Sequence, residues 1–229
     1  MKIEILQLLE GAQKAKGLTV IIDVFRAFST ACYAFENGAS TIIPVGDIDQ
    51  AYSLKKKHPE FLLMGERFER KPEGFDFGNS PTHLLNVDLS GKTIVHTTSS
   101  GTQGIANAAN ADEIITGSFV NASAIRKYIQ IKDPGHVSLV CMGYSCQYPT
   151  DEDTFLAEYI KDKLEARETN FTAMVDKLRN GSGARLFEPE NQEWSPSSDF
   201  DLCLSLSRFN FILRVEREGE LNYLRKIEL

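Results

Sequence analysis

Short apolar runs alternate along this chain with stretches whose apolar residues recur at helical spacing. The run from Leu18 to Ile22 is apolar or β-branched at every position, which is typical of a strand buried on both faces. After it, Ala27 and Ala31 fall on one helical face, and the stretch stops at Gly38, a residue type that commonly follows a helix. The same pattern predicts strands at residues 18–22, 41–45, 61–64, 93–95, 113–115 and 137–141, and helices at residues 27–37, 49–58, 104–110 and from 121 onward.

Buried strands that alternate with helices predict a three-layer α/β/α fold with a mainly parallel or mixed sheet. The last third is less regular. Thr150 is placed to cap an amphipathic helix, which we expect to continue through residues 165–180 up to a break at 180–183. A short helix at 199–206 should precede two strands, 209–215 and 221–227, that form a C-terminal antiparallel hairpin. We expect residues 1–229 to form a single domain, with a less regular lobe from about residue 150 to 229.

Composition narrows the function classes. The chain has 229 residues, of which 42% are hydrophobic and 25% charged, so a large buried core is expected and wholesale disorder is not. Its net charge of −7 argues against a general nucleic-acid binder or a membrane-surface protein. An anionic ligand would therefore need a local pocket.

The four cysteines show neither a CxxC pair nor a zinc-ligand pattern, which indicates reduced thiols in a cytoplasmic protein. The first eleven residues do not resemble a signal peptide, and no segment approaches the roughly 18 apolar residues of a membrane span.

Polar residues gather directly after the predicted strands. Asp23 and Arg26 follow the first strand, and Glu66 and Arg67 follow the third. Ligands of open α/β sheets bind beyond the carboxyl ends of the strands, so these side chains should share one rim. The arginines would grip phosphate or a second acidic group, although each could instead pair with a neighbouring carboxylate.

Three carboxylates are candidates for a metal site. Mg²⁺ prefers hard oxygen ligands, often one or two carboxylates together with waters and phosphate oxygens. Asp23 and Glu66 are expected to share such an ion. Asp76 is a third candidate, with the alternative that Phe75 and Phe77 anchor its loop while it faces solvent.

The loop after the fourth strand has the composition of an anion cradle. Hydroxyls and a glycine precede a helix, whose start offers free N–H groups. The loop lacks the Gly-Lys-Ser/Thr ending of a Walker motif, which disfavours a nucleotide triphosphatase. Simple capping is the alternative, especially for the second set after the fifth strand. The candidate substrate-binding residues are Asn79, Ser80, Thr97, Thr98, Ser99, Ser100, Gly101, Thr102, Ser118 and Asn121.

Other polar residues have ordinary explanations. His96 precedes the cradle but is expected in the core, and the acids at 151–153 suit the start of a helix. Asp199 and Asp201 either cap the short helix at 199–206 or close one edge of the site.

Taken together, these segments resemble the 2-phosphosulfolactate phosphatases. The resemblance covers nearly the whole chain and rests on residues 22–30, 65–67, 74–81, 97–102 and 117–122, with Glu152-Asp153 and residues 157–159 further on. It implies a magnesium-dependent hydrolase that removes phosphate from 2-phospho-3-sulfolactate. It further implies that the product, 3-sulfolactate, belongs to coenzyme M biosynthesis in methanogens and to sulfonate metabolism in bacteria.

We therefore hypothesise a phosphoric monoester hydrolase whose catalytic residues are Asp23, Arg26, Glu66 and Arg67, with a small anionic phosphate ester as its partner. The nucleophile is either a metal-bound water or Asp23 itself; the absence of a DxD pair favours water. A metal-assisted hydrolase or lyase on another phosphorylated hydroxy acid, and a non-catalytic binder of an anionic metabolite, are the alternatives. Whether the chain forms a homo-oligomer stays open.

Overall fold

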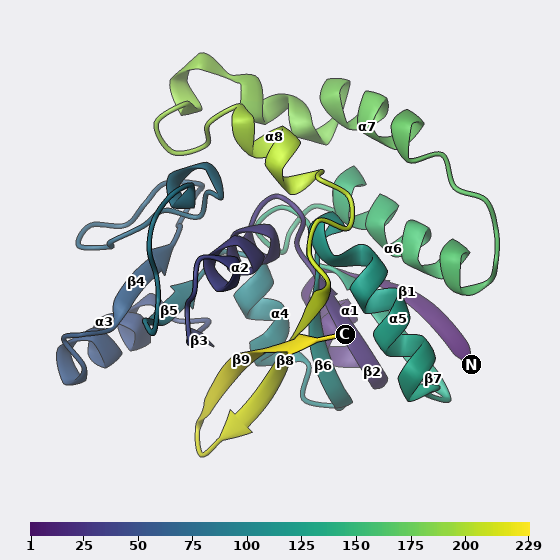
Figure 1. The fold of residues 1–229 in the computed structure, drawn as a ribbon, viewed down its shortest axis with the longest axis horizontal. Helices are drawn as coiled ribbons and strands as arrows, with labels where there is room; N and C mark the ends of the chain where they lie inside the picture. Colours follow the sequence, from purple (N-terminus) through teal and green to yellow (C-terminus); the bar gives the residue numbers. More distant parts are fainter.

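A mixed nine-stranded sheet with helices on both faces organises the computed structural model, which describes residues 1–229 (Figure 1). The strands are β1 (Lys2–Gln7), β2 (Gly17–Ile22), β3 (Thr41–Pro44), β4 (Leu62–Gly65), β5 (Thr93–Thr97), β6 (Ala111–Gly117), β7 (His136–Cys141), β8 (Phe211–Glu218) and β9 (Leu221–Glu228). The α-helices are α1 (Leu8–Lys14), α2 (Ala27–Glu36), α3 (Ile48–Lys57), α4 (Gly101–Asn107), α5 (Ala122–Lys132), α6 (Asp151–Leu164), α7 (Phe171–Asn180) and α8 (Ser198–Cys203). The predicted α/β/α class, with its mixed sheet and C-terminal antiparallel hairpin, is confirmed.

Strand β2 shows why the central strands are apolar at successive positions. Ile21 packs into one core with residues of α1, α2 and α4, whereas Val20 and Ile22 pack into a second core beneath α5 and α6. A strand covered on both faces gains burial from every residue, so its sequence does not alternate.

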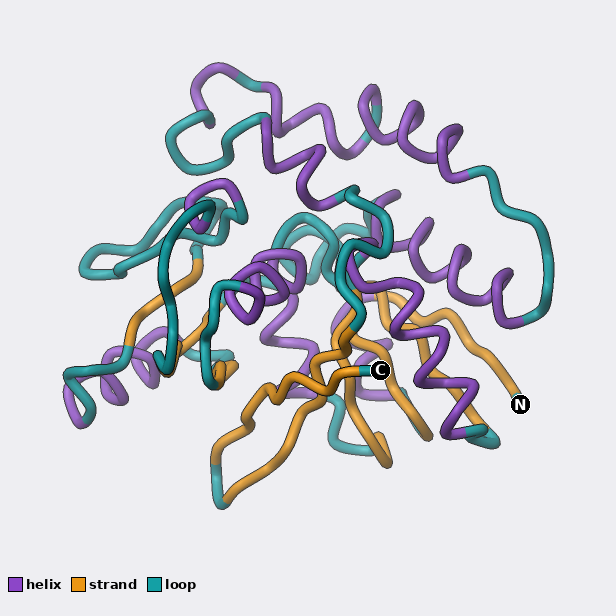
Figure 2. Tube along the Cα trace, in the orientation of Figure 1, coloured by secondary structure: helices purple, strands orange, loops and turns teal.

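The hairpin of β8 and β9 lies in the middle of the sheet, whose order is β1-β7-β2-β6-β8-β9-β3-β5-β4 (Figure 2). It separates two blocks of parallel strands. The hairpin pairs along eight residue pairs within itself, but β8 meets β6 through two pairs and β9 meets β3 through one. The sequence predicted the hairpin but not its central place.

Two local predictions differ from the structure. Strand β1 and helix α1 were not predicted, because their apolar residues are interrupted by Glu4, Gln7 and Glu10. The helix expected to run through 165–180 is instead broken after α6. Asn170 begins α7 by accepting a hydrogen bond from the Ala173 amide (3.0 Å), so the local cap overrides continuation.

The segment from α7 to α8 lies over the carboxyl ends of the strands (Figures 1 and 2). The break expected at 180–183 is a change of helix type, since α7 ends at Asn180, Gly181 follows it, and a 3-10 helix begins at Ser182 and runs to Phe187. None of the helices combines the length and the apolar character that crossing a membrane requires.

Gly65, the last residue of β4, lies close to the backbone of Thr97, the last residue of β5. Its φ is +148°, and a Cβ added there would lie 1.9 Å from the Thr97 carbonyl oxygen. We expect Gly65→Ala to lower the free energy of unfolding by about 3 kcal/mol, measured by urea denaturation, because the clash is with backbone.

Gly135→Ala is the matched control, since an added Cβ meets nothing within 4 Å there. Its effect should stay within about 0.5 kcal/mol. Equal losses of stability in the two variants would contradict this account of Gly65.

Candidate active site

A polar recess opens at the carboxyl ends of the parallel strands, with a volume of about 380 Å³ that includes space open to solvent. The loops after four strands, β2, β4, β5 and β7, contribute to it, as expected for an open α/β sheet. The lining residues are Asp23, Phe25, Arg26, Glu66, Glu69, Asn79, Ser99, Ser100, Gly143, Tyr144 and Ser145.

Asp23 stands at the end of β2 and is held by the first residues of two helices. Its Oδ1 accepts a hydrogen bond from the Ala27 amide at the start of α2 (3.1 Å). Its Oδ2 accepts one from the Gly101 amide at the start of α4 (2.8 Å). Because α4 follows β5, this single carboxylate joins the two parallel blocks of the sheet.

Glu66 follows β4 and is held in a similar way. Its Oε1 accepts a hydrogen bond from the Ser99 amide (2.6 Å), and its Oε2 accepts from the Ser99 hydroxyl (3.1 Å) and the Glu69 amide (2.9 Å). Asp23, Glu66 and the loop at 97–102 therefore meet at one mouth of the sheet.

Two further carboxylates reach this region from α6, and the sequence interpretation missed both. Asp153 accepts hydrogen bonds from the Val24 amide (2.8 Å) and the Gly143 amide (2.9 Å), and Glu152 is equally buried. A signal existed in the spacing: Glu152 lies four residues before Leu156 and Asp153 four before Ala157, on the buried face of the helix.

The charges of Asp23 and Asp153 are poorly compensated by other groups of the chain. Burial raises the pKa of Asp23 to about 6, and the charges of Glu66 and Glu152 add to the rise against the hydrogen bonds from Ala27 and Gly101. Burial, followed by the charges of Asp23 and Glu152, holds the pKa of Asp153 well above its usual range. Neither of these aspartates forms an ion pair with a lysine or arginine of the chain.

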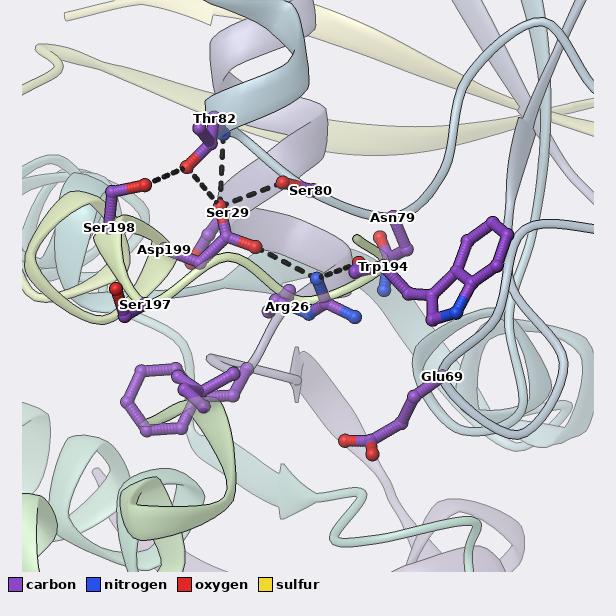
Figure 3. Close-up of polar contacts among 12 residues, drawn as sticks. Arg26, Ser29, Glu69, Asn79, Ser80, Thr82, Trp194, Ser197, Ser198 and Asp199 are labelled. Atoms are coloured by element: carbon purple, nitrogen blue, oxygen red, sulfur yellow. Dashed lines mark hydrogen bonds and ion pairs between the residues drawn. The ribbon is translucent and has the colours of Figure 1, made fainter. Parts of the chain in front are cut away.

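Arg26 is the cation that lines the recess (Figure 3). Its Nη1 donates to Asp199 Oδ2 (2.8 Å) and to the Trp194 carbonyl oxygen (2.8 Å), and only 3% of its side chain is exposed. Asp199 does not itself line the recess but pairs with Arg26, which does, and it accepts no hydrogen bond from an amide of its own helix.

A second arginine near the recess, Arg185, was not identified from the sequence. It lies 3.1 Å from Glu69 and 3.0 Å from Glu152, and so links the 3-10 helix at 182–187 to the rim. Phe25 and Tyr144, which line the recess, flank its guanidinium. Its partners lie far away in sequence, so no local pattern indicated this contact.

Asn79 is positioned by a neutral histidine. Burial lowers the pKa of His96 to about 3, and its Nε2 lies 3.3 Å from Asn79 Oδ1. With its proton on Nε2, His96 donates to that oxygen, which leaves the Asn79 amide nitrogen available as a donor. His96 lies in the core, as the sequence indicated.

Most other candidate substrate-binding residues contact the protein itself. Ser99 and Ser100 line the recess, but the Ser99 and Gly101 amides already donate to carboxylates. The rest lie outside the recess, where they bond as follows: Thr98 with Thr102, Thr97 with Arg67, Ser80 with Asp199, Ser118 with Ser29, and Asn121 with the Ser118 amide.

Of the predicted catalytic and metal-binding residues, Arg67 and Asp76 are not brought to the recess. Arg67 donates to the carbonyl oxygens of Glu66 (2.7 Å) and Gly46 (3.0 Å), so it stabilises the loop after β4 and does not face the recess. Asp76 accepts from the Leu63 amide (2.8 Å), because residue 77 pairs alongside β4 and turns the preceding carboxylate away. The predicted trio of Asp23, Glu66 and Asp76 is thus not assembled, and the chain has no cluster of three or more His, Cys, Asp or Glu side chains arranged to hold a metal ion.

The raised pKa of Asp23 has a consequence for stability. A buried carboxyl whose folded pKa exceeds its unfolded value near 3.8 stabilises the fold fully below that value and loses this contribution as the pH rises through about 6. Asn does not titrate. With metals chelated, wild type should therefore lose unfolding free energy between pH 5 and pH 7.5 through Asp23, and Asp23→Asn should not. The variant should gain stability relative to wild type over this range.

Urea denaturation at the two pH values measures this difference, and any pH-independent loss of a hydrogen bond cancels from it. A difference that is the same at both values would contradict the raised pKa.

Comparison with known proteins places the chain in a family. Residues 4–218 match the family described as 2-phosphosulpholactate phosphatase. A protein of Thermotoga petrophila named probable 2-phosphosulfolactate phosphatase is 43% identical over 65% of this chain and 63% of its own length, a little under two thirds of that relative.

Two relatives with the same printed name align more fully. The protein of Caldanaerobacter subterraneus subsp. tengcongensis is 32% identical over 86% of this chain and 87% of its own. The protein of Bacillus subtilis is 28% identical over 92% of both chains. The chain therefore belongs to the 2-phosphosulpholactate phosphatase family.

Proposed function

We propose that this chain is a magnesium-dependent phosphatase that hydrolyses 2-phospho-3-sulfolactate to 3-sulfolactate and phosphate. The observation that carries the proposal is the buried carboxylate pair of Asp23 and Glu66 beside Arg26 in one recess of a chain with this family membership. A phosphate ester that also bears sulfonate and carboxylate groups needs several cationic or donor groups in one small space.

The donor set fits a magnesium ion. Carboxylate oxygens are hard ligands, and each oxygen of Asp23 accepts one backbone N–H, which leaves a lone pair free. The raised pKa of Asp23 also indicates that no nearby positive charge of the chain offsets its buried carboxylate. Asp23 and Glu66 are the residues that would hold the ion. When bound, it would offset their charge and polarise the phosphoryl group.

The chain's own groups account for binding and orientation. Arg26 offers a guanidinium edge to an oxyanion of the substrate, and the Asn79 amide nitrogen offers a further donor. In hydrolysis, the oxygen of water bonds to phosphorus, the ester P–O bond breaks, and a proton ends on the released hydroxy acid. Both oxygens of Asp23 accept backbone N–H bonds, which lowers their nucleophilicity and supports attack by water over an aspartyl phosphate.

A phosphate-release assay tests the activity. Wild-type protein with Mg²⁺ should release phosphate from 2-phospho-3-sulfolactate and lose this activity in EDTA, and Asp23→Asn should lower kcat about a thousandfold or more. Asp76→Asn is the matched control, because Asp76 lies outside the recess and its amide oxygen can keep the bond to Leu63.

Near-normal turnover in Asp23→Asn would remove the proposed role of this residue. Faster release from 2-phospholactate or 3-phosphoglycerate than from the sulfonated ester would instead favour another phosphorylated hydroxy acid as substrate.

Metal binding has a readout that does not depend on turnover. Saturating Mg²⁺ should raise the Tm of wild type by about 5 °C at pH 7.5. The rise should be smaller at pH 5, because below a pKa of about 6 a proton competes with the cation at Asp23. Thermal denaturation with Mg²⁺ or EDTA measures it; Asp76→Asn should behave as wild type, and an unchanged wild-type Tm at pH 7.5 would contradict the magnesium site.

A further inference from the structure

The pair of Arg26 and Asp199 stands apart from the other ion pairs of the chain. It is the one pair in which both side chains are almost wholly buried, with 3% and 0% exposed. Burying two charges is unfavourable unless their geometry and remaining hydrogen bonds compensate, so a buried pair is weak evidence for a stabilising role. Its position at the recess points to a different role.

Asp199 collects hydrogen bonds from two separate segments (Figure 3). Its Oδ2 accepts from Arg26 Nη1 at 2.8 Å, and its Oδ1 accepts from the Ser80 hydroxyl (2.8 Å), the Thr82 amide (3.0 Å) and the Thr82 hydroxyl (2.6 Å). Asp199 belongs to α8, Arg26 precedes α2, and Ser80 belongs to the long loop after β4. One carboxylate therefore fixes two walls of the recess relative to each other.

The contacts of Arg26 leave part of its guanidinium available. Only Nη1 donates to the protein, to Asp199 and to the Trp194 carbonyl oxygen, while Nε and Nη2 have no acceptor within the chain. Arg26 lines the recess together with Asp23 and with Asn79, the neighbour of Ser80. A guanidinium held at one nitrogen presents its other edge in a fixed plane, which suits two parallel hydrogen bonds to a carboxylate, sulfonate or phosphoryl group.

We infer that Asp199 is a positioning residue, which sets the plane of the Arg26 guanidinium so that its free edge binds an oxyanion of the substrate. The inference rests on the proposed phosphatase function for the reaction, but the orientation of Arg26 toward an anion can be tested without turnover. Asp199 does not touch the reacting atoms; it acts through Arg26 and, by way of Ser80, on the Asn79 wall.

A double-mutant cycle tests this role. The variants are Asp199→Asn, Arg26→Gln and the two combined, and the combined variant leaves no buried charge without a partner. Asp201→Asn is the matched control from the same helix, since Asp201 is exposed and lies 3.3 Å from Arg179. The measurements are kcat and KM for phosphate release from 2-phospho-3-sulfolactate, together with the Tm shift produced by sulfoacetate, a small dianion with a carboxylate and a sulfonate.

Asp199→Asn should lower kcat/KM about 100-fold, largely through KM, because a misplaced guanidinium loses its paired hydrogen bonds. It should also lose the sulfoacetate shift, while Asp201→Asn keeps both. The combined variant should be no worse than Arg26→Gln alone, since Asp199 acts through Arg26. Asp199→Asn can also be assayed with phenyl phosphate, which has no second acidic group. If Asp199→Asn loses as much kcat/KM with phenyl phosphate as with 2-phospho-3-sulfolactate, Arg26 binds the phosphoryl group. If it loses less, Arg26 binds the carboxylate or the sulfonate.

Activity of Asp199→Asn within twofold of wild type would overturn the inference. The inference would also be overturned if Asp199→Asn lowered kcat/KM by the same factor in the Arg26→Gln variant as in wild type. A merely structural role of Asp199 predicts that result. If Asp199→Asn alone does not fold, the combined variant is compared with Arg26→Gln. A kcat/KM of the combined variant well below that of Arg26→Gln would then overturn the inference. If wild type releases no phosphate, the proposed function fails, and the sulfoacetate shift still decides between the outcomes for Asp199.

Discussion

The end of this molecule that carries the candidate active site depends on backbone amides that hold buried carboxylates. Asp23 receives the first amides of α2 and α4, and Glu66 receives the amide of Ser99 just before α4. The Asp23–Gly101 bond joins the end of β2 to the helix that follows β5, and the Glu66–Ser99 bond joins the loops after β4 and β5. The hairpin of β8 and β9 connects the two parallel blocks of the sheet through few residue pairs, so the bond between Asp23 and the Gly101 amide contributes to the alignment of the blocks at the recess.

The same contacts leave the recess rich in negative charge. Arg26 and Arg185 reach it, but each is already paired with an acid, Arg26 with Asp199 and Arg185 with Glu69 and Glu152. Asp23 and Asp153 stay without a cationic partner, and their pKa values are raised. The magnesium ion proposed above would supply the positive charge that this recess lacks.

Sequence patterns predicted those parts of the fold and the site that depend on local order along the chain. The apolar runs predicted the parallel strands that follow β1 in the chain. Asp23, Arg26 and Glu66 were predicted as site residues because they follow strand ends, where ligands of α/β sheets bind. Arg67 shows the limit of this reasoning. It directly follows Glu66, whereas Arg26 lies three residues after Asp23, yet the Arg67 guanidinium donates to backbone carbonyl oxygens and does not reach the recess. Asp199, Arg185 and the central place of the hairpin depend on contacts between distant segments, which spacing does not encode.

The central hairpin also bears on how the chain reaches its native state during synthesis. Residues 211–228 link β6 to β3, so the two parallel blocks cannot form one sheet before the last twenty or so residues of this sequence have left the ribosome. Until then, the edges of β6 and β3 are unpaired, and exposed strand edges are open to pairing with other chains. Nascent chains of this protein are therefore expected to need protection from chaperones in the interval when both blocks have been made but the strands that join them are still inside the exit tunnel.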